Sequence, residues 1–381
     1  MNKKTRMIHG GYTTDEDTGA VTTPIYQTST FLQDDIGDLR KGYEYSRSGN
    51  PTRHALEDLI ADLEFGQHGF AFGSGMAAIS AVIMLLDEGD HLIINSDVYG
   101  GTYRALTQVF NRFGIEADFV DTTDVDQIES YIKDKTKMLY IETPSNPLLQ
   151  VTDIKKVADI VAQHELISVV DNTFMTPYFQ NPLKLGTDIV LHSATKYIGG
   201  HSDVVAGLVA TSDDAIAERL GFIQNSTGGV LGPQDSYLLI RGIKTLGLRM
   251  EQIQRNAKTL VGLLQQHEAV ERVYHPSIES HKNSDVHAQQ ADGHTGVVSF
   301  VVKDTEAAKK VISNTQYFTL AESLGAVESL ISVPALMTHA SIPQQVREEQ
   351  GIADGLIRLS VGIEDTDDLV ADLQHALDQL K

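Results

Sequence analysis

The chain has 381 residues, of which 41% are hydrophobic, and its formal net charge at pH 7 is −22. This length predicts two or three domains, and the apolar fraction is that of a globular protein with a sizeable core. The acidic charge argues against nucleic acid and anionic membranes as partners, because both need basic patches. The sequence has no cysteine, which excludes disulfides, thiolate catalysis and cysteine-ligated metals.

The first fifty residues have little periodicity. The N-terminal segment Met1–Arg6 is basic, but no apolar stretch follows it, so it does not resemble a secretory signal. No apolar run in the chain approaches the length of a membrane span. A cytoplasmic location is therefore expected. Residues 1–50 are polar and irregular, which predicts an extended arm that another surface must order.

Residues 51–240 alternate apolar, strand-like runs with helical patterns. The expected strands are His91–Asn95, Ile115–Val120, Met138–Ile141, Ile167–Asp171, Ile189–His192 and Val204–Ala210. The expected helices include Met76–Leu86, Tyr103–Phe113 and Ile154–His164. This alternation predicts a mostly parallel sheet with helices on both faces. Ligands of such sheets bind beyond the carboxyl ends of the strands, so functional side chains are expected just after each strand.

A long helical pattern over Gly232–His267 leads into a smaller region. Strands are expected there at Val297–Val302 and Leu356–Val361, and the last helical pattern lies within Asp365–Lys381. The fold class predicted is therefore α/β, with a large domain over residues 51–240 and a smaller α/β C-terminal domain over residues 241–381.

One lysine has unusual surroundings. Lys196 follows the apolar run Asp188–Leu191, within a segment rich in hydroxyl and glycine residues, Ser193–Ser202. A lysine that ends a buried strand is costly unless its charge is lost or paired. Enzymes use such a desolvated amine to form a Schiff base with a carbonyl compound. Taken alone, Lys196 fits an ordinary surface lysine in a glycine-rich loop better, so the other strand ends must support the functional interpretation.

Polar groups suited to a phosphorylated pyridine ring occur at several strand ends. Asp171 ends an apolar strand, where its carboxylate could keep a pyridine nitrogen protonated or simply cap the next helix. The turn Phe72–Ala78 combines glycines with a helix start, an arrangement that binds phosphate but is also a common structural device. The hydroxyls of Ser193 and Thr195 could add donors to a phosphate.

Two further residues have both a functional and a structural interpretation. Tyr99 lies after a strand, where its ring could stack on a ligand, although a loop tyrosine is as simple an explanation. Arg358 lies within an apolar strand and needs an anionic partner, either a substrate carboxylate or a buried ion pair. No histidine spacing matches a metal site, and no G-x-G-x-x-G motif follows a strand, which disfavours a nicotinamide dehydrogenase.

Together these residues are similar to a known family. Asp188–Ser202 matches, position by position, the attachment-site signature of the pyridoxal-phosphate enzymes of cysteine and methionine metabolism. Other motifs of that family follow in the same order: Tyr45–Arg53, Ser74–Met76, Tyr99–Thr102, Glu142–Pro147, Val170–Thr173 and Glu322–Gly325. The resemblance runs essentially end to end.

The resemblance implies a pyridoxal 5′-phosphate enzyme of fold type I, like aspartate aminotransferase. The implied cofactor-binding residues are Tyr45, Arg47, Gly75, Met76, Tyr99, Asp171, Thr173, Ser193, Thr195 and Lys196, and the implied substrate-binding residues are Asn146, Glu322, Ser323 and Arg358. Lys196 would carry the cofactor, Asp171 would pair with the pyridinium nitrogen and Tyr99 would stack on the ring, so these three are the expected catalytic residues. No metal is implied.

The resemblance also implies an assembly. Tyr45 and Arg47 would reach the phosphate bound by the neighbouring subunit, which gives the N-terminal arm a reason to be extended. Family members are usually homotetramers, built as dimers of dimers whose active sites are shared between subunits.

The activity implied is the α,γ-elimination of cystathionine to cysteine, 2-oxobutanoate and ammonia, with homocysteine as a second substrate. Glu322 stands where γ-acting members carry an acid and cystathionine β-lyases commonly carry a bulky aromatic residue. Gly101 stands where methionine γ-lyases carry a cysteine. Cystathionine γ-synthase, which performs γ-replacement on an O-acylhomoserine, and cystathionine β-lyase stay open as alternatives. A non-catalytic member would be expected to lose Lys196, Tyr99 or Arg358, and all three are present.

Overall fold

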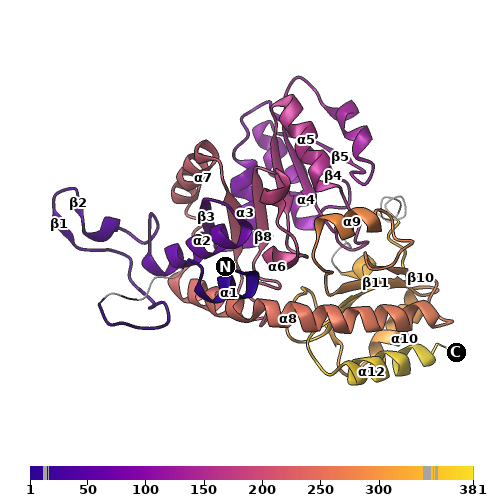
Figure 1. The fold of residues 1–381 in the computed structure, drawn as a ribbon. Coiled ribbons are helices and arrows are strands. Elements are labelled where there is room, and N and C mark those ends of the chain that lie inside the picture. Colours follow the sequence, from indigo (N-terminus) through magenta and orange to yellow (C-terminus); the bar gives the residue numbers. More distant parts are fainter. Residues whose placement is uncertain (12–14, 16, 338–344, 346, 348–350, 381) are drawn as a thin grey trace.

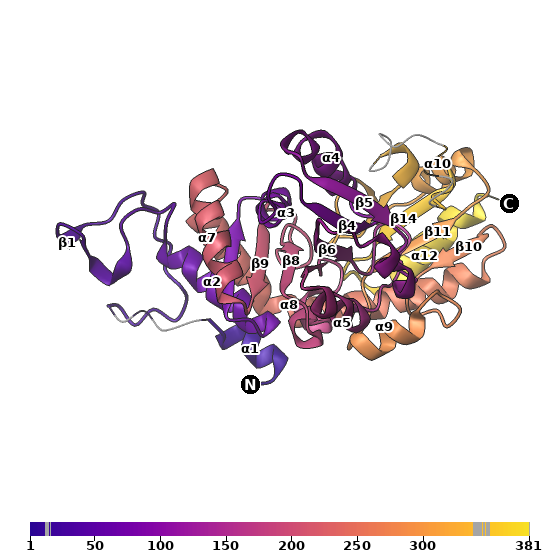
Figure 2. The same ribbon diagram turned by 90° about the horizontal axis from the view of Figure 1, so that it is seen from above.

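Two β-sheets organise the chain in the computed structural model, which describes residues 1–11, 15, 17–337, 345, 347 and 351–380 (Figures 1 and 2). The larger sheet has the strand order β3-β9-β8-β7-β6-β4-β5 and the smaller one the order β10-β11-β14-β13-β12. The larger sheet consists of β3 (His68–Phe72), β4 (His91–Asn95), β5 (Glu116–Val120), β6 (Thr136–Glu142), β7 (Ile167–Asp171), β8 (Ile189–Ser193) and β9 (Gly207–Thr211). The smaller sheet consists of β10 (Arg272–Tyr274), β11 (Val297–Val301), β12 (Thr319–Leu320), β13 (Leu330–Ser332) and β14 (Leu356–Ser360).

The large sheet is mostly parallel, as predicted. Strands β5, β4, β6, β7 and β8 run parallel, whereas β9 pairs antiparallel with both β8 and β3. The antiparallel step arises because the chain returns from β8 to β9 without a crossover helix, through the segment that contains Lys196. The carboxyl ends of β6, β7 and β8 therefore meet at one edge, beside the start of β9.

Helices cover the sheets and connect them. They are α1 (Lys3–His9), α2 (Pro51–Glu64), α3 (Gly75–Ile83), α4 (Gly100–Gln108), α5 (Ile154–His164), α6 (Thr176–Phe179), α7 (Asp214–Thr227), α8 (Pro233–Gln266), α9 (Ser284–Gln290), α10 (Thr305–Ser313) and α12 (Thr366–Asp378). Short 3-10 helices occupy Arg40–Gly42, Phe110–Phe113, Val125–Tyr131, Pro182–Leu185 and Pro334–Leu336. No helix in the described ranges combines the length and apolar character that a bilayer crossing requires.

Several helix starts follow from local sequence. The side chains of Asn50, Ser74, Asp153 and Asp213 accept backbone N–H groups in the first turns of α2, α3, α5 and α7. Pro51 and Pro233 occupy the first positions of α2 and α8, where a missing N–H costs nothing. These signals explain why the predicted helices Ile154–His164 and Gly232–His267 agree with α5 and α8 to within one residue.

Helix α8 runs past both sheets along one side of the molecule (Figure 1). Its apolar face packs with α1, α2 and α6 at one end and with β10, β11 and α12 at the other. The expected domain boundary between residues 240 and 241 falls inside this helix.

The N-terminal fifty residues do not behave as one arm. The first residues form α1, which packs on α2 and α8 of the same chain, with Met7 buried and Arg6 paired with Asp62 at 2.6 Å. The prediction of irregular structure is wrong for this helix, because its one buried methionine was too weak a periodic signal. Beyond it, the short hairpin β1 (Gln33–Asp35) and β2 (Asp38–Leu39) extends away from the body (Figures 1 and 2). Residues 12–14 and 16 of the expected arm lie outside the described part.

Other elements were not predicted. The sequence patterns did not identify β3, β10, β12 and β13 as strands, because these strands are short or only partly buried. The predicted strands at residues 297–302 and 356–361 agree with β11 and β14, both fully buried. The strand expected at residues 204–210 begins later, at Gly207, because the preceding residues belong to the turn after Lys196. The last predicted helix agrees with α12, and Lys381 lies outside the described residues.

A histidine cluster lies between β10 and β11. His275 Nε2 is 3.1 Å from the Thr295 carbonyl oxygen, and His287 Nε2 is 2.9 Å from that of Gly293. The rings of His287 and His294 stack with their centroids 5.0 Å apart. Burial, together with neighbouring histidines and Lys258, lowers the pKa of His287 and His294 to about 4, and burial lowers the pKa of His275 to about 3.

We predict that acid destabilises the fold through this cluster. The histidines of the unfolded chain become protonated below about pH 6.5, whereas those of the folded chain stay neutral down to about pH 4. The free energy of unfolding therefore falls as the pH falls from about 6.5 to about 4. Replacing the buried His287 (His287→Gln) should reduce the loss of unfolding free energy between pH 7 and pH 5 by roughly 1–2 kcal/mol. Urea unfolding at pH 7 and pH 5 measures this difference in unfolding free energy. The exposed His375→Gln is the control, and equal pH dependence in both variants would contradict the prediction.

Candidate active site

A cavity of about 380 Å³ opens at the carboxyl ends of β6, β7 and β8, where it meets β14 of the smaller sheet. Of the residues predicted from sequence, those lining it are Gly75, Met76, Tyr99, Asn146, Asp171, Thr173, Ser193, Thr195, Lys196, Glu322, Ser323 and Arg358. Strand ends that are far apart in sequence therefore converge, as expected for a parallel sheet. The remaining lining residues are Ser74, Ile79, Glu142, Phe174, Val205 and Leu324.

Lys196 projects into this cavity from the turn after β8. Its Nζ donates a hydrogen bond to Ser323 Oγ at 2.8 Å. Burial and, to a smaller extent, the nearby Arg358 guanidinium lower the pKa of Lys196 to about 8, against the opposing effect of Glu322. A substantial fraction of the amine is therefore neutral near pH 8, which is the form that attacks a carbonyl carbon.

Asp171 at the end of β7 faces the same cavity. Its Oδ1 accepts hydrogen bonds from the Thr173 backbone N–H at 3.0 Å and from the Thr173 hydroxyl at 2.5 Å. Burial raises the pKa of Asp171, and these bonds oppose that effect. The Thr173 hydroxyl also accepts the Ser193 N–H at 2.8 Å, so the ends of β7 and β8 are fixed to each other.

Glu142 is a functional candidate that the sequence reasoning missed. It ends β6 beside Asp171, and its Oε2 accepts the backbone N–H of Tyr99 at 3.0 Å. Burial and the negative charge of Asp171 raise the pKa of Glu142 well above its usual range. Two hydrogen bonds from Thr173 and one from the Tyr140 hydroxyl favour the charged form of Asp171, whereas burial raises the pKa of Glu142 well above its usual range, so a single negative charge is better held on Asp171. The sequence signal that could have identified Glu142 is an acidic residue at the end of an apolar strand, one strand before the strand that ends in Asp171.

The start of α3 forms a narrow cradle against Ser193. The Ser74 side chain caps the helix by accepting the Ala77 N–H at 3.0 Å, and Gly75 is the first helical residue. A Cβ atom at Gly75 would lie 2.9 Å from Ser193 Oγ, so only glycine leaves this space open. The free N–H groups of a helix start and the hydroxyl of Ser193 therefore border one small space, a combination suited to phosphate.

The smaller sheet contributes a buried cation to the cavity. Arg358 in β14 is 3% exposed, and its Nη1 and Nη2 donate to Asn146 Oδ1 and to the Ser323 carbonyl oxygen, both at 2.9 Å. Its Nε is buried and has no hydrogen-bond partner among the described residues. Burial lowers the pKa of Arg358 to about 10, so it stays charged at neutral pH. No carboxylate is paired with it at ion-pair distance in the described part of the chain, which leaves it available for an anionic ligand.

Tyr45 and Arg47 are not part of this cavity. Both side chains are exposed, with the Arg47 guanidinium 5.2 Å from the Tyr45 ring centroid and its Nε donating to Asn225 Oδ1 at 3.1 Å. The structure therefore separates them from the other predicted residues of the same chain.

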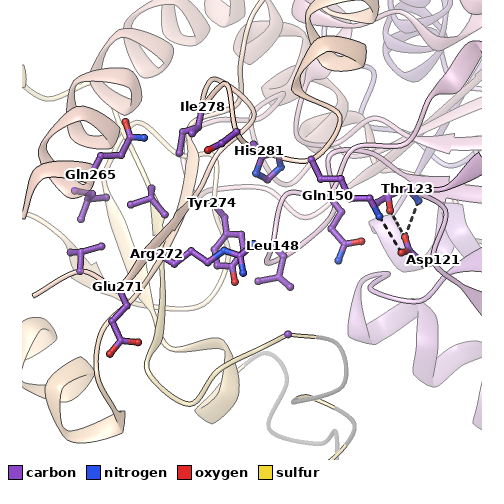
Figure 3. Close-up of a pocket in the computed structure, with 16 residues that line it drawn as sticks. Asp121, Thr123, Leu148, Gln150, Gln265, Glu271, Arg272, Tyr274, Ile278 and His281 are labelled. Atoms are coloured by element: carbon purple, nitrogen blue, oxygen red, sulfur yellow. Dashed lines mark hydrogen bonds and ion pairs between the residues drawn. The ribbon is translucent and has the colours of Figure 1, made fainter.

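A second cleft, of about 500 Å³, lies elsewhere, beside β10 (Figure 3). Asp121, Gln150, Arg272 and His281 are among its lining residues, and none of the predicted site residues is. Its charged groups are already engaged: Asp121 accepts hydrogen bonds from Thr123 and Lys282, and His281 Nε2 is 2.7 Å from the Leu149 carbonyl oxygen. Within the described residues, no group of three or more His, Asp or Glu side chains is arranged to hold a metal ion.

Comparison with known proteins gives the family of the chain. The model of the Cys/Met metabolism PLP-dependent enzymes matches residues 4–378. The chain belongs to this family. It is 58% identical to a cystathionine γ-lyase of Bacillus subtilis over 380 residues and 56% identical to a cystathionine β-lyase of Lactococcus lactis subsp. cremoris over 376 residues, with at least 99% of each chain covered.

A solved structure supports the same assignment. The chain superposes on a cystathionine γ-lyase from Lactobacillus plantarum, complexed with L-serine, with a TM-score of 0.96 and 49% sequence identity over 99% of both chains. The predicted fold class, type I with a mostly parallel sheet, is thereby confirmed, as are the family and the dependence on pyridoxal phosphate. The relatives from Bacillus subtilis and Lactococcus lactis are named for different elimination reactions, so sequence identity alone does not select the reaction.

The cavity fits the family's cofactor. It combines a lysine amine whose pKa is lowered to about 8, the Asp171 carboxyl at the neighbouring strand end, and the open space between Gly75 and Ser193. These groups are suited to an aldehyde, a ring nitrogen and a phosphate, respectively. The unpartnered Arg358 Nε is a further donor in the same cavity, suited to an anionic ligand.

We predict that the two charges beside Lys196 shift the pKa of its amine in opposite directions. Reductive methylation of the cofactor-free protein with formaldehyde should label Lys196 with a midpoint near pH 8. The variant Arg358→Met should raise this midpoint, because a neighbouring cation is removed, and Glu322→Gln should lower it. Mass spectrometry of the Lys196 peptide across pH 6–10 measures labelling. Shifts of the same sign in both variants would contradict this arrangement.

Proposed function

We propose that the protein is a cystathionine γ-lyase, which converts L-cystathionine and water to cysteine, 2-oxobutanoate and ammonia and also acts on homocysteine. The observation that carries this proposal is the Glu322 carboxylate in the same cavity as Lys196 and Arg358. Glu322 affects the pKa of both basic side chains, so it lies within electrostatic range of them. Cystathionine has an amino acid group at each end, and the site offers a cation for one carboxylate and an anion for the distal ammonium.

The chemistry is divided between the cofactor and the chain. Pyridoxal phosphate supplies, when bound, an aldehyde carbon for an amine and an aromatic ring that withdraws electrons from the substrate. We propose that Gly75, Met76, Ser193 and Thr195 hold its phosphate. Asp171 would keep a proton on the ring nitrogen, aided by Thr173, which orients the carboxylate.

The remaining residues act on the substrate. Arg358, Asn146 and Ser323 would bind the α-carboxylate and thereby orient the bond from Cα to hydrogen. Lys196, as the free amine, would be the base that removes the Cα proton, gives that proton up and so becomes able to remove a Cβ proton, after which the sulfur leaves Cγ as a thiolate. Tyr99, which is 42% exposed at the cavity mouth, would cover the ring and assist the proton transfers.

β-Elimination is the second candidate function. Its support is the relative of 56% identity that is named as a cystathionine β-lyase. In that reaction the same base removes the Cα proton, but the bond from Cβ to sulfur breaks, which yields homocysteine and pyruvate. γ-Replacement on an O-acylhomoserine uses the same early steps and differs in the nucleophile that arrives. Product identity therefore separates all three.

We predict that purified holoenzyme given cystathionine alone forms 2-oxobutanoate in excess over pyruvate. The same protein given cysteine and O-acetyl- or O-succinylhomoserine should form little cystathionine. Chromatography of the keto acids and of cystathionine measures the outcome. A majority of pyruvate would select β-elimination, and efficient synthesis of cystathionine would select γ-replacement.

We predict that Glu322→Gln raises the KM for cystathionine about tenfold with a smaller change in kcat, because the distal ammonium loses its partner equally in ground and transition states. Homocysteine lacks that distal amino acid group and is the matched control, so its KM should stay unchanged. Equal effects on both substrates would argue against a role of Glu322 in binding the distal ammonium.

We predict that Lys196→Ala lowers kcat by a factor on the order of 10³ or more, because the base is lost. Circular dichroism should show an unchanged fold. Borohydride should fix the cofactor to Lys196 in the parent protein only. Retained turnover in the variant would overturn the role of Lys196.

We further propose that the protein is a homotetramer, built as a dimer of dimers, in which Tyr45 and Arg47 complete the phosphate site of the neighbouring subunit. Their exposure and their separation from the cavity of their own chain support this assignment.

The cross-subunit role of Arg47 predicts a specific pattern in hybrids. In the first hybrid, a minor Arg47→Ala chain is assembled with an excess of Lys196→Ala chain. The minor chain supplies Lys196 and its neighbour supplies an intact Arg47, so the minor chain should bind cofactor normally. A minor parent chain assembled with an excess of Arg47→Ala/Lys196→Ala chain should bind it at least tenfold more weakly. Borohydride fixation followed by mass spectrometry reads only the Lys196-bearing chain. The reverse pattern would contradict sharing.

A further inference from the structure

A second group of buried charges lies outside the cavity, at the base of the segment that carries Tyr45 and Arg47. Arg53, in the first turn of α2, is 2% exposed. Its Nη1 donates to the Ser46 carbonyl oxygen at 2.6 Å and its Nη2 donates to the Arg47 carbonyl oxygen at 3.1 Å. Its Nε lies 3.4 Å from Glu57 Oε1. The two terminal nitrogens are therefore hydrogen-bonded to the backbone of the same chain, whereas Nε is within ion-pair distance of Glu57 but has no hydrogen-bond partner among the described residues.

This arrangement fixes a backbone rather than binding a ligand. A planar guanidinium that holds two consecutive carbonyl oxygens restricts the two peptide units that carry them, which a lysine ammonium would not do with the same geometry. These peptides join Ser46 to Arg47 and Arg47 to Ser48, so they flank the Cα atom from which the Arg47 side chain extends. Asn50 adds a bond from its Nδ2 to Ser46 Oγ at 3.0 Å.

The held segment presents anion-binding groups to the outside. Tyr45 is 44% exposed and Arg47 is exposed, and neither lines the cavity that contains Lys196. A phenol and a guanidinium are well suited to a phosphate, and the backbone that carries them is held by two hydrogen bonds from a buried arginine.

Glu57 connects the same guanidinium to the larger sheet. Its Oε1 accepts the Ala71 N–H of β3 at 2.9 Å, and β3 leads directly into the turn that contains Ser74 and Gly75. The carboxylate that faces Arg53 therefore also holds the strand from which the phosphate cradle of its own chain begins.

We propose that Arg53 is a positioning residue for the cofactor phosphate of the neighbouring subunit. It fixes the two peptides on either side of the Arg47 Cα atom so that the Tyr45 and Arg47 side chains project in the orientation that a phosphate requires, and Glu57 connects Arg53 to β3. This inference rests on the proposed function, in which Tyr45 and Arg47 serve a site across the subunit boundary.

Hybrid assemblies test the inference with pyridoxal 5′-phosphate as the probe. In the first hybrid, a minor Arg53→Met chain is combined with an excess of Lys196→Ala chain. In the second, a minor parent chain is combined with an excess of Arg53→Met/Lys196→Ala chain. Cofactor is titrated into the cofactor-free assemblies and fixed with borohydride, and the labelled fraction of Lys196 gives the apparent dissociation constant without reference to turnover.

The expected result is a defect that crosses the subunit boundary. The first hybrid should bind like the parent, and the second should show a dissociation constant raised at least tenfold. A purely structural role of Arg53 would weaken the first hybrid instead, since that chain carries both the change and the Lys196 site, and this result would overturn the inference. No effect in either hybrid would overturn it as well.

The matched Arg47→Ala hybrids separate the two levels of the proposal. If they show the cross-subunit pattern and the Arg53→Met hybrids do not, the role of Arg53 alone fails. If neither pair of hybrids shows the cross-subunit pattern, the proposal that active sites are shared between subunits fails as well. Arg6→Met is the control arginine, because Arg6 pairs with Asp62 of the same helix α2 at 2.6 Å but does not contact the Tyr45–Arg47 segment. It should be neutral in both hybrids.

A second variant guards against loss of assembly. Arg53→Lys keeps a cation beside Glu57 but cannot hold both carbonyl oxygens at once, so it should assemble and reproduce the same pattern with a smaller increase in the dissociation constant. Parent-like binding of both Arg53→Lys hybrids would overturn the inference.

Discussion

The amine of Lys196 is partly shielded from water and lies in one cavity with a buried cation, Arg358, and most features of the site follow from that placement. Burial and the neighbouring charge lower the pKa of Lys196 to about 8, while Ser323 holds the Nζ atom at 2.8 Å. Stabilising two cations in one cavity requires anionic or polar partners from elsewhere in the fold. Asn146 and the Ser323 carbonyl oxygen supply them for Arg358, and Glu322 moderates both charges.

The two sheets divide this work. The larger sheet brings the ends of β6, β7 and β8 together, which places the acids Glu142 and Asp171 next to each other, and the hydrogen bonds from Thr173 favour the charged form of Asp171. The smaller sheet delivers Arg358 from β14. Helix α8 packs against elements of both regions, so a side chain of the smaller sheet can bond to Asn146, in the loop that follows β6 of the larger sheet.

Much of the site could be predicted from the sequence, because in a parallel sheet each functional group follows its own strand. Asp171 and Lys196 were recognisable at the ends of apolar runs, and the motif around Lys196 extended the prediction to distant segments such as Ser323. Glu142 was missed because its local signal, an acid at the end of an apolar strand, does not show that folding buries it against Asp171, where its pKa is raised. The α1 helix was missed since its stability comes from packing on α2 and α8 rather than from periodicity.

The sequence by itself determined the strand and helix alternation, the family and the chemical identity of the groups at the strand ends, because these depend on residue type and short-range order. Only the tertiary structure decided which of those groups share a cavity, which acid keeps the charge and which residues stay apart. Tyr45 and Arg47 illustrate the difference: their chemistry is readable in the chain, but their exposed position, fixed from below by the buried Arg53, arises from contacts between segments that only folding brings together.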